Sequence, residues 1–266
     1  MKTVAKAALV WLGLMVGGFP AAQAEDLLLK DGNLIRGVGI RREGQFLFAK
    51  PEGGQEQIVP LANVARITFR ESQGLRDARQ AFKDGESRSI ISNTGSELTY
   101  HRFWVDMPGS VWLPIMELRV PALAAAGRPD DVAELIRDWV ATGNPDLDTA
   151  VALMKLKESK APKEELMKAY TAATAGNPST LTAAIAWLEM GNLALEARDW
   201  AAAIRNFVSV QVFAPKWRPL HPSAMLGCVK ACVGNEQPDH AVPFLDDLKN
   251  EFPKSSQSRI APTLVR

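Results

Sequence analysis

The most constraining feature of this sequence is the stretch from Trp187 to Pro215, which has the pattern of two short helices joined by a tight turn. Apolar residues recur at helical spacing in its first half, and again from Trp200 to Val210. Between the two halves, Asp199 is a good N-cap because its carboxylate can accept hydrogen bonds from free backbone N–H groups. Pro215 cannot continue the second helix. The stretch is therefore predicted to form an antiparallel helical hairpin.

Gly191 lies on the apolar face of the first predicted helix. A glycine inside a helix costs about 1 kcal/mol relative to alanine, so its presence indicates a packing requirement. We expect the neighbouring helix to approach closely at this position.

The hairpin resembles a tetratricopeptide repeat. The residues that match this family in order and spacing are Trp187, Met190, Gly191, Ala194, Ala203, Phe207 and Pro215. Prolines that would close successive repeats recur 33 to 38 residues apart, at Pro108, Pro145, Pro178, Pro215 and Pro253, close to the family period of about 34. The resemblance implies four to five helical hairpins stacked as a solenoid, and unrelated helical hairpins are the alternative.

The predicted second helices of the other hairpins carry apolar residues at corresponding positions. Ala133 and Val140 precede Pro145 as Ala203 and Val210 precede Pro215. The next two sets are Leu166, Tyr170 and Ala173 before Pro178, and Ala241, Leu245 and Leu248 before Pro253. These matches in spacing indicate further copies of the second helix.

Residues 25–70 show instead the short alternation of strands and turns that is typical of small β domains. Five strands are predicted in about 45 residues, which favours a strongly bent barrel. Gly37 and Gly39, inside the second predicted strand, indicate a bend or bulge. The runs DGNLIRGVGIRREGQFLF and IVPLANVARITF resemble small Sm-like or SH3-like barrels.

The predicted fold class is therefore α+β: a small N-terminal β-barrel at 25–70, followed by an all-α tetratricopeptide-like solenoid at 71–254 and a polar tail at 255–266.

Residues 1–24 have the pattern of a cleavable secretory signal peptide, with Lys2 and Lys6, a short apolar segment and a small-residue cleavage site at 22–24. No cysteine lies near that site, so lipid attachment is not expected. We predict a periplasmic or secreted protein, at most peripheral to the cell envelope. An uncleaved anchor is the alternative, and the intact mass of the exported protein would distinguish the two.

Composition and residue spacing argue against several function classes. The formal net charge of +1 provides no basic field for nucleic acid. The basic residues of the predicted barrel, Arg36, Arg41 and Arg42, are few, and Arg41 and Arg42 are expected to be solvated loop charges. His101, His221 and His240 are far apart and lack metal-ligand spacing, so surface or capping roles are expected. No carboxylate pairs with a His, Ser or Cys in a recognisable arrangement. We therefore predict no enzyme activity, no catalytic residue, no metal site and no cofactor.

Cys228 and Cys232 are four residues apart, which places both on one face of a predicted helix. Burial as small apolar side chains is predicted for them, and a strained local disulfide is the alternative in an oxidising compartment.

The tetratricopeptide resemblance implies a scaffold that binds a protein or peptide partner on a concave face lined by the first helices. The candidate partner-binding residues are Leu188, Asn192, Leu195 and Glu196, with Trp217 as an exposed contact in a loop. Asn192 resembles one element of the carboxylate clamp of that family, but cationic residues are scarce nearby, so a solvated asparagine is expected. The charged turn at 155–165 is expected to be a solvated surface.

A second hypothesis is a structural or assembly component of the cell envelope. In this hypothesis the small barrel self-associates or binds cell-wall glycan. The sequence leaves the partner and the oligomeric state open.

Overall fold

The computed structural model describes residues 24–51 and 53–265 of the 266-residue chain. These residues form two compact units. The first, which we call the β unit, comprises residues up to 70 together with 106–110, and the second, the helical unit, comprises 71–105 and the chain from 111 onward. Apart from Ala24, the predicted signal peptide lies outside the described residues.

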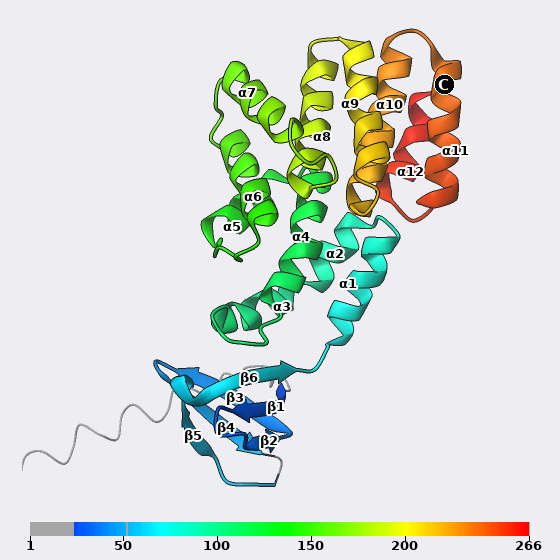
Figure 1. The fold of residues 1–266 in the computed structure, drawn as a ribbon. Coiled ribbons are helices and arrows are strands. Elements are labelled where there is room, and N and C mark those ends of the chain that lie inside the picture. The colour runs from blue at the N-terminus through cyan, green and yellow to red at the C-terminus, as the bar shows by residue number, and fades with distance from the viewer. Residues whose placement is uncertain (1–23, 52, 266) are drawn as a thin grey trace, which may run out of the picture. The chain divides into compact units, whose positions relative to one another are not determined.

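The described part of the β unit contains six strands and one short 3-10 turn (Figure 1). Their bounds are β1 Ala24–Leu29, β2 Leu34–Arg36, β3 Val38–Glu43, β4 Phe46–Pro51, β5 Gln57–Pro60, η1 Leu61–Asn63 and β6 Val64–Phe69. They form two antiparallel three-stranded sheets, with the orders β2-β1-β6 and β3-β4-β5.

The closed barrel expected from the sequence is wrong for these strands, because the second predicted strand is divided in two. Gly37 has a φ of +60°, a left-handed conformation that strand residues do not adopt. The chain bends at this glycine, so that β2 pairs with β1 whereas β3 pairs with β4. The bend predicted at Gly37 is thus confirmed, and it separates the two sheets.

Residues 106–110 belong to the β unit through contacts with β3 and β6. The Ile67 N–H donates to the Pro108 carbonyl over 2.9 Å. Arg42 binds the Asp106 carboxylate with two nitrogens, at 2.5 and 3.0 Å. This pairing raises the pKa of Arg42 and lowers the pKa of Asp106. The expectation that Arg42 is a freely solvated charge is therefore wrong.

The helical unit contains twelve α-helices among the described residues, with four short 3-10 turns between and after them. The first seven helices are α1 Gln73–Lys83, α2 Ser87–Asn93, α3 Gly95–His101, α4 Trp112–Ala126, α5 Pro129–Arg137, α6 Pro145–Glu158 and α7 Lys163–Thr174. The remaining helices are α8 Leu181–Glu196, α9 Trp200–Phe213, α10 His221–Gly234, α11 Val242–Glu251 and α12 Ser256–Ile260. The 3-10 turns are η2 Arg102–Trp104, η3 Arg218–Leu220, η4 Pro238–Ala241 and η5 Ala261–Leu264.

The helical hairpin predicted from Trp187 to Pro215 is present as α8 and α9. Asp199 is the N-cap of α9, and its carboxylate accepts from the Ala202 N–H over 3.0 Å. A Cβ added at Gly191 would lie 2.5 Å from the Phe207 ring of α9. The N-cap and the close approach at Gly191 are therefore both confirmed.

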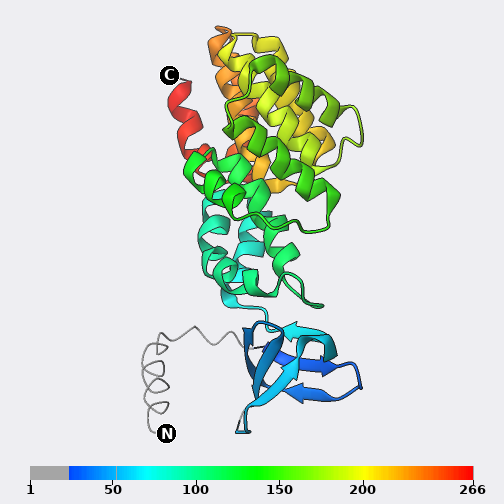
Figure 2. The same ribbon diagram turned by 90° about the vertical axis from the view of Figure 1, so that its left-hand side faces the viewer.

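Successive hairpins pack side by side. In both views α8, α9, α10 and α11 follow one another as neighbours (Figures 1 and 2). The first helices of consecutive hairpins also touch, since α4 contacts α6, α6 contacts α8 and α8 contacts α10. Each hairpin therefore buries apolar surface against the next one, and its stability depends on its neighbours.

The residues at the matched second-helix positions differ in burial. Ala203, Phe207 and Val210 are fully buried, as are Tyr170 and Leu248. In α5, by contrast, Ala133 is exposed and Val140 is 37% exposed beyond the end of the helix. Ala133 lies on the face of α5 opposite the buried Val132 and Leu135, and Val140 follows the end of the helix at Arg137, so the match in spacing does not extend to burial.

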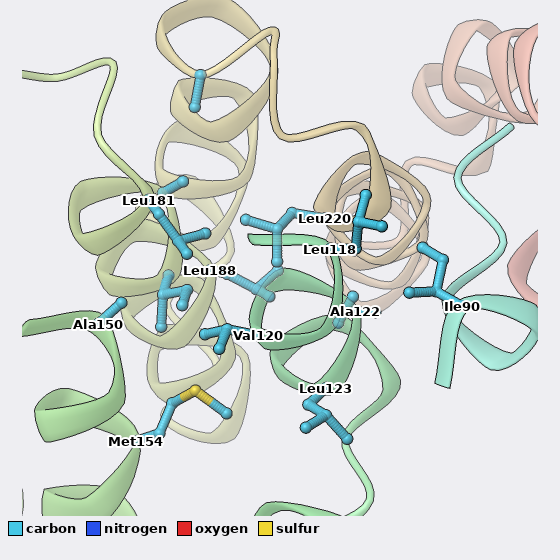
Figure 3. Close-up of a cluster of buried hydrophobic side chains, with 14 of the residues drawn as sticks. Ile90, Leu118, Val120, Ala122, Leu123, Ala150, Met154, Leu181, Leu188 and Leu220 are labelled. Carbon is cyan, nitrogen blue, oxygen red and sulfur yellow. The ribbon is translucent and has the colours of Figure 1, made fainter. Parts of the chain in front are cut away.

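The main core of the helical unit is built around α4. This helix has apolar residues on all sides, which is typical of a helix covered by neighbours. Figure 3 shows side chains of α4, including Leu118, Val120 and Leu123, among those of α2, α6 and α8. Smaller apolar clusters join α6 to α7 and α10 to α11.

The segment predicted to be a polar tail, residues 255–266, contains α12 and η5. Ser258 and Ala261 are buried there, and the Ser255 side chain caps α12 by accepting from the Ser258 N–H. None of the helices in the described part of the chain combines the length and apolar character that a membrane span requires.

Candidate functional site

A pocket with a volume of about 240 Å³ lies where α4, α6 and α8 meet the start of α5 and the side of α7. We call it the α4–α8 pocket. Its apolar lining comes from Leu123, Ala124, Val132, Leu153, Met154 and Ile185. Its polar lining comes from Arg128, Lys157, Glu158, Tyr170 and Glu189. An apolar surface with a few convergent polar groups is the usual composition of a ligand site.

Glu189 is the central charge of this pocket and is only 8% exposed. Its Oε2 accepts from Lys157 Nζ over 2.7 Å and from Asn192 Nδ2 over 3.5 Å. A buried carboxylate must be paired, and Lys157 provides the pairing charge from the neighbouring first helix. Burial, followed by the field of Glu189, raises the pKa of Tyr170 well above its usual range, so this phenol stays protonated.

A second ion pair extends the polar surface along α8. Lys163 Nζ lies 3.1 Å from Glu196 Oε2, and both side chains are mostly exposed. We call Lys157, Lys163, Glu189 and Glu196 the charged strip. It places cations of α6 and α7 beside anions of α8, so the surface has both signs of charge.

The expectation of a solvated charged turn at 155–165 does not include the ion pairs that Lys157 and Lys163 form with α8. The paired residues are 32 and 33 apart in the chain, close to the spacing of the prolines. Opposite charges separated by about one repeat are a signal that could have predicted these contacts.

The candidate partner-binding residues on α8 differ in their accessibility. Leu188 is 3% exposed and lies in the main core, where Figure 3 shows it near Val120, so it does not contribute to a binding surface. Leu195 is half-buried against the same core. Asn192 is half-buried beside Glu189, and Glu196 is exposed. The structure thus places Asn192 next to Glu189 of the pocket wall and Glu196 in the exposed ion pair with Lys163.

Trp217 lies away from that group and is half-buried. Its Nε1 donates to the Ser179 carbonyl over 3.2 Å, and Lys216 Nζ lies 4.5 Å from the ring centre. The indole therefore connects the loop after α9 to the loop before α8.

Two of the three histidines are buried, so a surface role is wrong for them, although His221 contacts the carbonyl of the residue that ends α9. His101 is 4% exposed and His221 is 5% exposed, and His221 Nε2 lies 3.1 Å from the Ala214 carbonyl. Burial lowers the pKa of His101 to about 4, although the Glu97 carboxylate is 3.4 Å away, and burial also lowers the pKa of His221.

We expect the helical unit to lose stability as the pH falls from 6.5 towards 4. In that window the unfolded chain binds protons at His101 and His221 that the folded protein does not bind, so acid favours unfolding. Urea denaturation at several pH values would measure this, and His101→Gln should weaken the dependence by the share that His101 contributes. The exposed His240 provides the control, because His240→Gln should retain the wild-type dependence.

Cys228 and Cys232 are both free and buried. The predicted role as buried apolar side chains is therefore confirmed, and the alternative of a local disulfide is not. Burial raises the pKa of Cys228 to about 12. We therefore expect neither thiol to react with an aromatic disulfide reagent in the native protein, and both to react after denaturation. Absence of reactive thiols in the denatured, unreduced protein would contradict this expectation.

The titratable side chains that line the α4–α8 pocket are Arg128, Lys157, Glu158, Tyr170 and Glu189. Within the part of the chain that the structure describes, its lining includes no Ser, Thr, Cys or His, the side chains that most often act as nucleophile or base with a carboxylate. Among the described residues, no group of three or more His, Cys, Asp or Glu side chains could hold a metal ion. Comparisons of this chain with protein-family models, with curated proteins and with solved structures found no match.

Proposed function

We propose that this chain is a non-enzymatic exported scaffold whose stacked, tetratricopeptide-like hairpins bind a protein or peptide partner at the α4–α8 pocket and the charged strip. The observation that carries the proposal is the position of the buried Glu189–Lys157 pair, on the wall of an apolar pocket and beside an exposed ion pair. Such a surface accommodates an apolar side chain in the pocket, while charged groups on either side of it meet the strip.

The test exchanges the charges of the exposed pair and leaves the pair intact. In the variant Lys163→Glu/Glu196→Lys, the ion pair can still form, but the field that a partner meets is reversed. We expect recovery of the partner, in a crosslinking pull-down from the envelope fraction, to fall by about tenfold because like charges then face each other.

The matched control is the exposed pair of Arg79 and Glu71, which are 2.8 Å apart on another part of the helical unit. The exchange Arg79→Glu/Glu71→Arg should leave recovery unchanged. Equal recovery with both exchanged variants would argue against the charged strip as the binding surface.

A second candidate function is envelope assembly through the β unit, by self-association or by binding cell-wall glycan. It is favoured by apolar residues on the outer face of sheet β3-β4-β5, where Phe48 pairs with Ile58 in the strand register and Phe46 lies two residues away. Ile58 is 62% exposed and Phe46 is 49% exposed. Arg41 lies 3.9 Å above the Phe48 ring.

Size measurement and sedimentation with cell wall distinguish the two forms of this second candidate. If the β unit self-associates, Ile58→Lys should shift the protein to a smaller species, because a charge would enter the apolar interface. The exposed Val242 of α11 gives the control variant Val242→Lys. A monomeric wild-type protein that does not sediment with cell wall would exclude the candidate.

A further inference from the structure

A second cavity in the helical unit has a volume of about 290 Å³ and contains a buried arginine. It lies among α3, α4 and α5, and shares no lining residue with the α4–α8 pocket. Its apolar lining comes from Leu98, Trp112, Met116 and Leu135. We call it the Arg119 cavity, and it is independent of the function proposed above.

Arg119 is only 8% exposed. Its Nη1 donates to the Ile91 carbonyl over 2.7 Å and to Thr94 Oγ1 over 3.0 Å. No carboxylate among the described residues lies within 4.0 Å of the guanidinium, and no described residue accepts from its Nε or Nη2. Arginine is almost never buried without a paired anion, because the loss of hydration is large.

The hydrogen bonds to α2 and Thr94 give a structural role to only one nitrogen of the Arg119 guanidinium, Nη1. Through Nη1, Arg119 caps the C-terminal end of α2, where carbonyl groups lack helical partners. The N–H groups of Nε and Nη2 remain, and they form one edge of the planar guanidinium. Two parallel N–H groups on such an edge match the two oxygens of a carboxylate.

The surroundings of the cavity define the charge of its ligand. Arg102 and Asp138, 3.4 Å apart, neutralise each other at its edge, while Glu134 is exposed beside it. Burial lowers the pKa of Arg119, and the carboxylates of Asp131 and Glu134 partly oppose that effect. Arg119 is thus one buried cation beside one exposed anion, Glu134. This arrangement favours a ligand with a single negative charge over a dianion, because Glu134 would repel the second charge.

We propose that the Arg119 cavity binds an organic monocarboxylate, with its carboxylate on the Nε–Nη2 edge of Arg119 and its apolar group against Leu98, Trp112 and Met116. The volume is at the small end of the range for ligand pockets, so the ligand is a small acid or the C-terminal residue of a longer chain. Both sources present the same chemistry.

Isothermal titration calorimetry of the full chain tests the proposal with five probes. The free-acid arm compares 3-phenylpropionate with 3-phenylpropionamide, which has the same shape without the charge. The chain-end arm compares a short peptide ending in phenylalanine with its C-terminal amide. Inorganic phosphate is the fifth probe. We expect at least one of the two carboxylates to bind, and we expect its amide and phosphate not to bind.

Three variants place this binding at Arg119. Arg119→Lys keeps a cation that can cap α2 but lacks the planar edge, so the affinity for the carboxylate should fall about tenfold. A Cβ added at Gly95, which lines the cavity, meets no atom within 4 Å. Gly95→Leu should therefore fill the entrance and abolish binding without changing the unfolding transition. Glu134→Gln should tighten binding about twofold to fivefold at low salt, because a repelling charge is removed.

The control is Gly176→Leu, at another glycine where an added Cβ meets nothing, and it should bind as the wild type does. Binding of only the free acid would assign the site to a small molecule, and binding of only the peptide would assign it to a chain terminus. Equal affinities for acid and amide, unchanged affinity in Arg119→Lys or Gly95→Leu, or no binding of either carboxylate by the wild-type protein would overturn the proposal.

Discussion

Replacing Phe207 with alanine is expected to destabilise the helical unit by about 3–5 kcal/mol, the usual cost of removing a fully buried phenyl ring. Phe207 of α9 has no exposed surface, and its ring lies between Gly191 of α8 and Gly227 of α10. The surrounding helices cannot collapse into the space without repacking three elements, which places the cost in the upper part of the range. Urea denaturation followed by circular dichroism would measure it.

The control on the same helix is Phe213→Ala. Phe213 is 47% exposed and contacts the Trp187 ring at a centroid distance of 5.4 Å. Its removal should cost about 1 kcal/mol or less, because little surface leaves the interior. A similar loss for both variants would contradict the enclosed position of Phe207.

The converse substitution adds a methyl group against the same ring. Gly227→Ala should be destabilising despite the better helix propensity of alanine, because the new Cβ would overlap Phe207. Combined with Phe207→Leu, the substitution should cost less than the sum of the two single changes, since the smaller side chain leaves space. Additive costs would show that the two residues do not share that space.

The second large effect is expected at Asp146, whose carboxylate caps a helix of the next hairpin. Asp146 lies in the first turn of α6, and its two oxygens accept from the Leu181 and Thr182 N–H groups of α8 over 2.8 and 2.9 Å. The Thr182 hydroxyl lies 2.8 Å from the same carboxylate. Thr180 caps the next N–H of α8, at Ala183. Together these two side chains satisfy the free donors of the first turn.

Asp146→Ala should therefore destabilise the helical unit by about 2–4 kcal/mol, since it leaves two donors of α8 without acceptors and removes a favourable charge at a helix N-terminus. Asp146→Asn should cost less, because an amide oxygen still accepts one of these bonds. Glu164, an exposed acidic residue in the first turn of α7, supplies the control. Glu164→Ala should change stability by less than about 0.5 kcal/mol, and an equally large loss there would contradict the capping argument.

Local patterns in the sequence were sufficient to predict the features that depend on neighbouring residues. The cap at Asp199, the end of α9 before Pro215 and the tight packing at Gly191 follow from helical spacing and backbone chemistry. The bend at Gly37 is also predicted from backbone chemistry. The division of the strand into β2 and β3, which join different sheets, is not predicted. Local spacing does not determine whether the strands on either side of a glycine continue in one sheet.

The candidate site depends on contacts between hairpins, and local patterns do not contain that information. Leu188 was placed on an open face although α4 covers it, because helical periodicity identifies an apolar stripe without showing which side the next helix occupies. The burial of Arg119 follows from the packing of α4 against α2, where its guanidinium reaches the Ile91 carbonyl. Charges about one repeat apart, as in Lys157 and Glu189, are the signal that links one hairpin to the next.

The assignment of residues 106–110 to the β unit has a consequence for dissecting this protein. The polypeptide passes from one unit to the other at 70, returns at 106 and leaves again after 110. A fragment that stops at 70 would lose the carbonyl that accepts from the Ile67 N–H and the carboxylate that holds Arg42. A single proteolytic cut near 71 would divide the β unit itself, because residues up to 70 would then be held to 106–110 only by non-covalent contacts. Expression of an isolated β unit therefore requires a chain that includes 106–110, for example one in which a short linker replaces the helices between 71 and 105.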